Sequence, residues 1–401
     1  MGKPRILVIT TAFHHTHRFR LHNFLPYLAS YLDIDVIDIP IFSYDLGFPE
    51  SLAEFTKRVV KEILEGNIIK YSRKDNINLF TIRSLCTGDF GPLCSISYIH
   101  ILSKKLHSSR YNAILTTPWI AGLISLIARK NLKGTPVVYE DVDRFYDFFR
   151  NDMKRILVKS IEYNVITRSD AVIAASPYLY LEDLELRKRK PTYFIPNGIE
   201  YDKFRNAARK AMERDKYAAV YVGAIEWWSG LDIAIKAFQR LVAQVPQARL
   251  YIIGDYRTKF GSCLMRLVKN LNLTANIIFM GRRSYDFIVN FLPRCRVGIL
   301  TFPRSEVTIK AFPYKVLEYA ASGLPIVMTD VSAIAGMIKT WRAGFVHREN
   351  DIEGISSSVI EMMINDHLWK EHSARAVELA SHFDVKKLAC REAQILQKLS
   401  T

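Results

Sequence analysis

Lys315 and Glu318 are charged residues three positions apart, and their placement suits a phosphate and a sugar hydroxyl. They fall in an expected helix that Pro313 opens and Gly323 follows, as these residue types commonly do. A cation in the first turn opposes the helix dipole, and lysine before glutamate is the weaker order for a helical ion pair. A ligand would explain both charges: a phosphate held by backbone N–H groups and Lys315, and hydroxyl groups bound by Glu318. A nucleotide sugar carries both groups; the alternative is two solvated surface charges.

Two short apolar runs flank the expected helix. Val297–Leu300 and Leu324–Val327 have the length and composition of strands buried in a parallel sheet. A polar loop, Arg304–Lys310, is expected between the first of these strands and the helix. Strands alternating with helices along the chain predict an α/β fold, and 401 residues are natural for two domains.

A set of residues around the helix forms a known pattern. Its members are Pro313, Lys315, Glu318, Tyr319, Ala321, Gly323 and Pro325. The run resembles the P-x-K-x-x-E-Y-x-A-x-G-x-P signature of GT-B glycosyltransferases, close to their large group 4. The resemblance implies two Rossmann-like, doubly wound α/β domains facing each other across a cleft, with the donor ribose bound by Glu318. Many members carry a second acidic residue in an E-x7-E pair; here that position holds Lys310, which leaves inverting and retaining stereochemistry both open.

The start of the second expected domain departs from the family again. Where the family usually shows V-G-R-x-x-x-x-K-G, this chain has Gly223 but Ala224 and Ser229 in place of the Arg and Lys that grip the donor diphosphate. Lys310 and Lys315 are expected to supply the missing charge. The residues predicted to bind the donor are Glu318, Lys315, Lys310, Gly223, Tyr314 and, in a loop beside the base, Arg282.

Acidic residues crowd the end of another expected strand, Pro136–Tyr139. They are Glu140, Asp141 and Asp143, and all are candidate catalytic residues. Carboxylates this close repel one another, which can raise one pKa and suit a general base for a sugar hydroxyl. The alternatives are an N-cap or ion-pair partners for Arg144 and Arg150. The pattern Y-E-x-x-D is similar to Y-[DE]-x-x-D stretches in bacterial polysaccharide glycosyltransferases of the GT-B type, which favours Asp143, with Glu140 as the alternate.

The loop after the first expected strand, Ile6–Thr10, is rich in His and Arg. It lacks the G-x-G-x-x-G pattern, so nicotinamide-dinucleotide binding loses its main support. The resemblance places this loop at the interdomain cleft and makes His14, His17 and Arg18 candidates for acceptor binding. Clustered His residues could indicate a metal, but no Cys or carboxylate accompanies them at zinc spacing, so no metal site is predicted.

The domain divisions follow from a second resemblance to the family. Residues 195–204 match its I-P-N-G-x-x-x-x-x-F pattern, which closes the first domain. The predicted organisation is an acceptor-binding domain at 1–204, a nucleotide-sugar-binding domain at 205–375, and a C-terminal helix at 376–401 that packs back on the first domain. A polar linker is expected at Arg205–Lys216.

Composition adds expectations about the environment. A net charge of +16 suits a phosphate-rich substrate or an anionic membrane surface, and no nucleic-acid recognition motif accompanies it. An expected basic helix, Asp147–Tyr163, could lie on an anionic bilayer or be an ordinary amphipathic surface helix. Five cysteines without C-x-x-C favour a reducing compartment, and neither a transmembrane run nor a signal peptide is expected. We therefore expect a cytoplasmic protein, or one peripheral on the inner face of the membrane.

Taken with the resemblance, these features predict an enzyme that moves a sugar from a nucleoside-diphosphate sugar to a glycan or lipid-linked acceptor. No cofactor or metal is expected, because cationic side chains can neutralise the leaving diphosphate. The alternatives are another GT-B activity, such as a sugar-nucleotide epimerase, and a non-catalytic binding protein. The missing Arg/Lys pair is the best support for the non-catalytic alternative.

Overall fold

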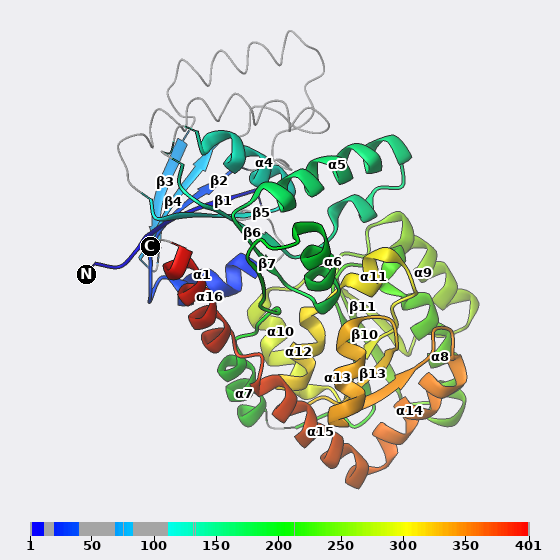
Figure 1. The fold of residues 1–401 in the computed structure, drawn as a ribbon. Helices are drawn as coiled ribbons and strands as arrows, with labels where there is room; N and C mark the ends of the chain where they lie inside the picture. Colours follow the sequence, from blue (N-terminus) through cyan, green and yellow to red (C-terminus); the bar gives the residue numbers. More distant parts are fainter. Residues whose placement is uncertain are drawn as a thin grey trace. The chain divides into compact units, whose positions relative to one another are not determined.

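The computed structural model describes residues 2–11, 20–39, 69–74, 76–82, 111–130, 132, 134–211 and 213–399 (Figure 1). The chain divides into two compact units: Met1–Pro196 with Lys386–Thr401, and Asn197–Val385. The sequence placed the corresponding divisions after residues 204 and 375. Among the described residues, no helix has the length and apolar character needed to cross a membrane.

The first unit contains a sheet with strand order β3-β4-β2-β1-β5-β6-β7-β8. Its strands are β1 Arg5–Thr10, β2 Asp33–Asp38, β3 Ile69–Lys74, β4 Ile77–Ile82, β5 Ala113–Thr117, β6 Val137–Asp141, β7 Ala171–Ala174 and β8 Thr192–Phe194. All neighbouring pairs are parallel except β3 with β4. The central strands β5, β6 and β7 are buried along their whole length, as near-continuous apolar runs in parallel sheets are.

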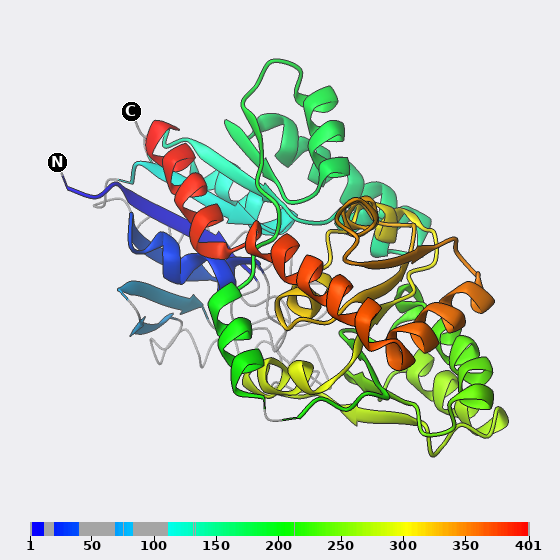
Figure 2. The same cartoon turned by 90° about the horizontal axis from the view of Figure 1, so that it is seen from below.

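Helices flank this sheet. They are α1 Arg20–Leu28, α4 Trp119–Ala128, α5 Asp152–Arg168, α6 Pro177–Arg187 and α16 Val385–Leu399, with a 3-10 turn at Phe145–Phe148. From Lys386 onward α16 belongs to this unit, although it ends the chain. Figure 2 shows it, in red, beside α1, to which a buried ion pair joins it.

The second unit contains a fully parallel sheet with strand order β11-β10-β9-β12-β13-β14. Its strands are β9 Ala218–Val222, β10 Arg249–Ile253, β11 Ile277–Gly281, β12 Val297–Leu300, β13 Ile326–Thr329 and β14 Gly344–His347. Strand order reverses between β9 and β12. Loops diverge at such a switch point, which makes the carboxyl ends of these two strands the expected ligand crevice.

The helices of this unit enclose one large apolar core. They are α7 Tyr201–Lys210, α8 Leu231–Gln244, α9 Lys259–Asn270, α10 Tyr285–Phe291, α11 Glu306–Lys310, α12 Tyr314–Ala321, α13 Ala333–Trp341, α14 Ile352–Ile364 and α15 Asp366–Ser381. Both units are Rossmann-like α/β domains, so the predicted fold class is confirmed.

Several local predictions are wrong. Arg205–Lys216 is not a linker throughout, because its first part lies in α7, which buries Phe204. The expected loop Arg304–Lys310 contains α11, because Ser305 and Thr308 form a capping box at its start. The expected helix Asp147–Tyr163 is a 3-10 turn followed by α5, whose N-cap is Asn151.

Candidate active site

Three loops meet closely at the carboxyl edge of the second sheet. A side chain at Gly254, after β10, would overlap the carbonyl oxygen of Gly223, after β9. A side chain at Gly230 would overlap the carbonyl oxygen of Thr301, after β12. Thr301 Oγ1 also donates a hydrogen bond to the Gly230 oxygen at 2.7 Å. Glycine therefore allows the loops that flank the switch point to pack backbone against backbone.

Lys315, in the first turn of α12, reaches this packed edge. Its ammonium lies where a side chain at Gly223 would be, and Gly223 has a φ of +142°, which favours glycine. Lys315 Nζ donates a hydrogen bond to Tyr221 Oη at 3.1 Å and lies 4.3 Å from the centroid of that ring. Tyr221 Oη in turn donates to the Ala224 oxygen at 2.7 Å. Gly223 and Lys315, both predicted from the sequence, are thus in contact.

The electrostatic environment of Lys315 suits an anion. Burial lowers its pKa to about 7, and the nearby Glu318 carboxylate raises it by a smaller amount. A phosphate bound against Lys315 would add opposite charge beside this desolvated cation, besides that of Glu318. Glu318 is half-buried one turn further along α12. A diphosphate at Lys315 and a ribose at Glu318 therefore remain compatible with the geometry of this helix.

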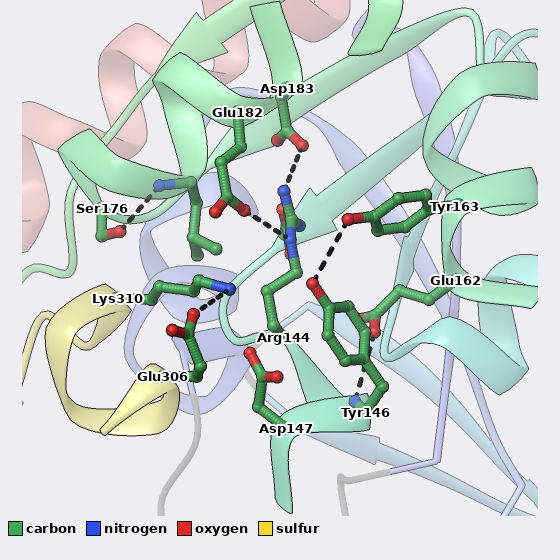
Figure 3. A network of polar contacts seen from close by, with 12 residues as sticks. Arg144, Tyr146, Asp147, Glu162, Tyr163, Ser176, Glu182, Asp183, Glu306 and Lys310 are labelled. Carbon is green, nitrogen blue, oxygen red and sulfur yellow. Dashed lines mark hydrogen bonds and ion pairs between the residues drawn. The ribbon is translucent and has the colours of Figure 1, made fainter. Parts of the chain in front are cut away.

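The other predicted donor residues, Lys310, Tyr314 and Arg282, differ in environment. Lys310 is buried in α11, and its ammonium forms an ion pair with Glu306 at 3.1 Å (Figure 3). This pair was not predicted from the sequence. The charge of Lys310 is thus already compensated in part. Tyr314 begins α12. Arg282 is exposed just after β11 and makes a minor contribution to the low pKa of Asp255, which the hydrogen bonds from Arg257 chiefly lower to about 2.

In the first unit, the acidic residues differ in environment. Glu140 and Asp141 lie inside β6 rather than after it, and both are fully buried. Successive strand residues point to opposite faces. Glu140 accepts a hydrogen bond from Arg20 Nε at 2.6 Å, whereas Asp141 pairs with Arg144. Asp141 is therefore an ion-pair partner of Arg144, which was one of the alternatives predicted from the sequence.

Arg144 is the centre of a buried polar network (Figure 3). Besides Asp141, it donates to Asp183 at 2.7 Å and to Glu182 at 3.1 Å. Burial, and then the charge of Asp141, raise the pKa of Asp183 to about 9. The same causes raise the pKa of nearby Glu162 to about 8. This network holds Asp141 in a buried ion pair with Arg144, as Arg20 holds Glu140. A catalytic role for Glu140 or Asp141 stays a prediction.

Asp143 is the exception in this group. It follows β6, is partly exposed, and has no hydrogen-bonding or ion-pair partner in the described parts of the chain. Burial, and then the charge of Asp141, raise its pKa to about 7. A carboxyl group with a pKa near neutrality can accept a proton from a hydroxyl at working pH. Asp143 therefore stays the candidate base.

The predicted acceptor residues His14, His17 and Arg18 lie outside the described residues. Within the described ranges, no group of three or more His, Cys, Asp or Glu side chains is placed to hold a metal. Metal independence stays a prediction. Sequence reasoning assigned no role to Arg20 or Tyr221. Arg20 meets Glu140 and Glu392, and Tyr221 meets Lys315, from distant parts of the chain, so no local pattern reports these contacts.

Residues 202–381 match the profile of the family described as Glycosyl transferases group 1. TuaH of Bacillus subtilis, a glycosyltransferase named for teichuronic acid biosynthesis, is 24% identical over 215 residues, which are 52% of this chain and 52% of that protein. The match thus covers about half the length of that relative. A UDP-Gal:alpha-D-GlcNAc-diphosphoundecaprenol alpha-1,3-galactosyltransferase of Escherichia coli is 21% identical over 72% of this chain and 75% of its own.

Solved structures share the fold over nearly the whole chain. Sucrose-phosphate synthase from Thermosynechococcus elongatus has a TM-score of 0.75 at 14% identity and covers 99% of both chains. Anabaena HepE, in complex with UDP and glucose, has a TM-score of 0.70 at 17% identity and covers 98% of this chain and all of its own. The GT-B fold that residues 313–325 implied is confirmed.

Proposed function

We propose that this chain, whose second unit is a group 1 glycosyl transferase domain on a GT-B fold, transfers a sugar from a nucleoside-diphosphate sugar to a glycan or lipid-linked acceptor. The observation that carries the proposal is the contact of Lys315 with Gly223 at the switch point of the second sheet. A partly desolvated cation at that place, on the first turn of a helix, is a ready site for a diphosphate.

The donor would occupy this edge. Its diphosphate would lie against Lys315 and the loop that begins at Gly223, and its ribose would meet the Glu318 carboxylate. Because Ala224 and Ser229 replace the usual cations, Lys315 carries most of the phosphate charge in this proposal, and Lys310 less because Glu306 pairs with it. The UDP bound by HepE supports a nucleoside diphosphate as the common chemistry. No metal is needed where a lysine neutralises the leaving diphosphate.

The acceptor would meet Asp143 of the first unit. In an inverting transfer, the Asp143 carboxylate takes the proton of the attacking hydroxyl while that oxygen bonds to the anomeric carbon and the diphosphate leaves. Asp143 suits this step because its pKa is raised to about 7 and no cation pairs with it in the described structure.

Titration calorimetry with UDP, GDP and their sugars tests the donor half of the proposal. We expect one of these nucleotides to bind wild type and to bind Lys315→Met at least tenfold more weakly. Arg240→Ala, which changes an exposed cation on α8, is the matched control and should leave the affinity unchanged. A protein that binds none of these nucleotides has no donor site. One that binds a nucleotide sugar yet never releases nucleoside diphosphate with any lipid or glycan acceptor is the non-catalytic alternative.

We also propose that the first unit associates with an anionic membrane surface through α5. Met153, Ile156 and Leu157 are 82%, 68% and 60% exposed. Their i, i+3, i+4 spacing places them on one face of the helix, while Val158, Val165 and Ile166 are buried. An apolar stripe next to cationic residues such as Lys154 suits insertion at a bilayer surface.

Sedimentation with lipid vesicles tests this association. Wild type should bind vesicles with anionic lipid more tightly than neutral ones, and binding should fall with salt, since each cation near the surface contributes about 1 kcal/mol. Ile156→Ser with Leu157→Ser should weaken binding, whereas Met265→Ser, an exposed apolar residue of α9 in the second unit, should not. Equal binding to neutral and anionic vesicles would refute the electrostatic part.

A further inference from the structure

A cavity of about 810 Å³ opens at the opposite edge of the second sheet from Lys315. It lies at the amino ends of β9 and β12, where Ala218 and Cys295 line it. We call it the amino-edge cavity. Since Lys315 lies at the carboxyl ends of these parallel strands, the cavity is separate from the donor site.

The amino-edge cavity has an excess of positive charge. The cationic side chains that line it are Lys210, Arg214, Lys216 and Arg294, and the acidic ones are Glu213 and Asp215, so four cations face two acids. Lys216 pairs with Asp366 at 3.3 Å. Without Lys216, the side chains that line the cavity still carry more positive than negative charge, which favours an anion.

Arg214 is the most constrained of these cations. Its guanidinium donates to the carbonyl oxygens of Cys295 and Ser322, and it lies 4.8 Å from the centroid of the Trp369 ring. Arg296 lies 4.4 Å from the same ring. Arg296 pairs with Asp366, but no carboxylate pairs with Arg214 in the described residues.

This crowding leaves the charge of Arg214 uncompensated. Burial, together with the positive charges of Arg296 and Arg205, lowers its pKa to about 10, although the adjacent Cys295 thiol acts in the opposite direction. The hydrogen bonds from Arg214 to the carbonyl oxygens of Cys295 and Ser322 do not neutralise its positive charge. An anion entering the cavity would supply the missing partner.

Aromatic rings form another wall of the amino-edge cavity. Tyr217, Tyr251 and Phe291 all line it. Tyr251 and Phe291 meet edge to face with centroids 5.2 Å apart, which fixes both rings. Rigid rings beside a guanidinium suit a ligand that has a planar or apolar part as well as a charged group.

We propose that the amino-edge cavity is a second binding site of this protein, for a phosphorylated small molecule whose phosphate pairs with Arg214, Arg294 and Lys210 and whose organic part packs on the aromatic wall. This site does not depend on the proposed transfer reaction. It would give the second unit a ligand besides its donor.

Calorimetry with inorganic phosphate and phenyl phosphate, on the full chain, tests the proposal. Lys315→Met provides the background, so that phosphate binding at the donor edge is weakened; circular dichroism checks its fold. We expect saturable binding of phenyl phosphate, at least threefold tighter than inorganic phosphate because of the rings. Adding Arg294→Ala and Lys210→Ala should weaken it about tenfold, as expected when charge-assisted contacts are lost.

These two positions are exposed, so their replacement should leave the core intact, whereas Arg214→Leu risks the fold. Adding Arg240→Ala instead is the matched control and should leave the affinity unchanged. Absence of saturable binding, or binding that Arg294→Ala and Lys210→Ala leave unchanged, would overturn the proposal. If phenyl phosphate does not bind in this test but wild type still binds a nucleotide, the second site is refuted and the proposed transfer function is unaffected.

Discussion

Arg20 Nη2 lies 2.7 Å from Glu392 Oε2, and both side chains are buried. The same guanidinium donates to Glu140 at 2.6 Å and to the carbonyl oxygen of Pro196 at 2.8 Å. One arginine thus connects α1, the strand that precedes Asp143, and the last helix of the chain. The ion pair with Glu392 attaches α16 to the first unit.

We expect Arg20→Met to destabilise the protein strongly. Removing the cation leaves the Glu140 carboxylate and the Glu392 carboxyl group buried without their partner, and breaking a buried ion pair such as Arg20–Glu140 costs about 3–5 kcal/mol. Urea unfolding followed by circular dichroism measures the loss. Arg375→Met is the control: both side chains of its pair with Glu378 are about half-exposed, so the change should be below about 1 kcal/mol. Similar losses in the two variants would contradict the role of Arg20.

Stability should fall as pH rises toward 8, partly because of Glu392. Burial, and then the charge of Glu140, raise the pKa of Glu392 from 4.5 to about 8. Between these values the folded state holds a proton that the unfolded state has released, so rising pH favours unfolding. Glu392→Gln mimics the protonated form and should reduce the difference in urea midpoint between pH 5 and pH 8.

Some of that difference should remain in Glu392→Gln, because Glu162 and Asp183 have raised pKa values of the same sign. Glu353→Gln, an exposed residue of α14, serves as the control and should leave the difference unchanged. If Glu392→Gln behaves like this control, Glu392 is ionised in the folded protein and the predicted proton is absent.

The local elements of the donor edge were predictable from the sequence. Val297–Leu300 is strand β12 as expected, and Pro313 and Gly323 flank α12 as expected. These features depend on apolar runs and on backbone preferences of single residues, which neighbouring positions reveal. That Lys315 and Gly223 belong to one site followed from the family pattern, whereas their direct contact is seen only in the structure.

The environment of the acidic residues was not predictable. The sequence ended the strand at Tyr139, because charged residues seldom lie inside buried strands. Glu140 and Asp141 do so because Arg20 and Arg144 pair with them from opposite faces of β6. Arg20 is 120 positions from Glu140, and no local pattern reports a contact at that separation.

Glu318→Ala should weaken nucleotide binding. If the carboxylate accepts the ribose hydroxyls, its removal costs about 1–3 kcal/mol, as for a charge-assisted hydrogen bond. The fold should survive, because Glu318 is only half-buried. Calorimetry with the nucleoside diphosphate that wild type prefers is the measurement. Unchanged affinity in a folded variant would remove Glu318 from the site.

Donor binding should weaken as pH rises above 7. The pKa of Lys315 is about 7 in the free protein, and the diphosphate needs the protonated form. Binding near neutral pH should therefore take up a proton, which appears as a dependence of the observed enthalpy on the ionisation enthalpy of the buffer. Because an arginine stays charged, Lys315→Arg should show neither the weaker binding above pH 7 nor the uptake of a proton. Identical pH dependence in Lys315→Arg would assign the effect to another group.

Asp143→Asn should lower turnover about 10²–10⁴-fold if the reaction inverts the anomeric centre, with donor binding nearly intact. The amide keeps the shape of the side chain and removes its basicity. Because the pKa of Asp143 is about 7, kcat/KM for the donor should rise with pH up to that value in wild type. Above pH 7, kcat/KM should fall again, because Lys315 then loses its proton. The profile is thus bell-shaped, with a maximum near pH 7.

Each limb of this profile belongs to one residue, which makes the assignments separable. Lys315→Arg should keep the acidic limb and lose the basic one, whereas Asp143→Asn should lose the acidic limb from its residual activity. Glu140→Gln and Asp141→Asn are the comparison variants, and we expect them to act mainly on stability, since both side chains are buried in ion pairs. If Asp143→Asn remains fully active with an unchanged acidic limb, Asp143 is not the base, and a retaining mechanism without a protein base becomes the better account.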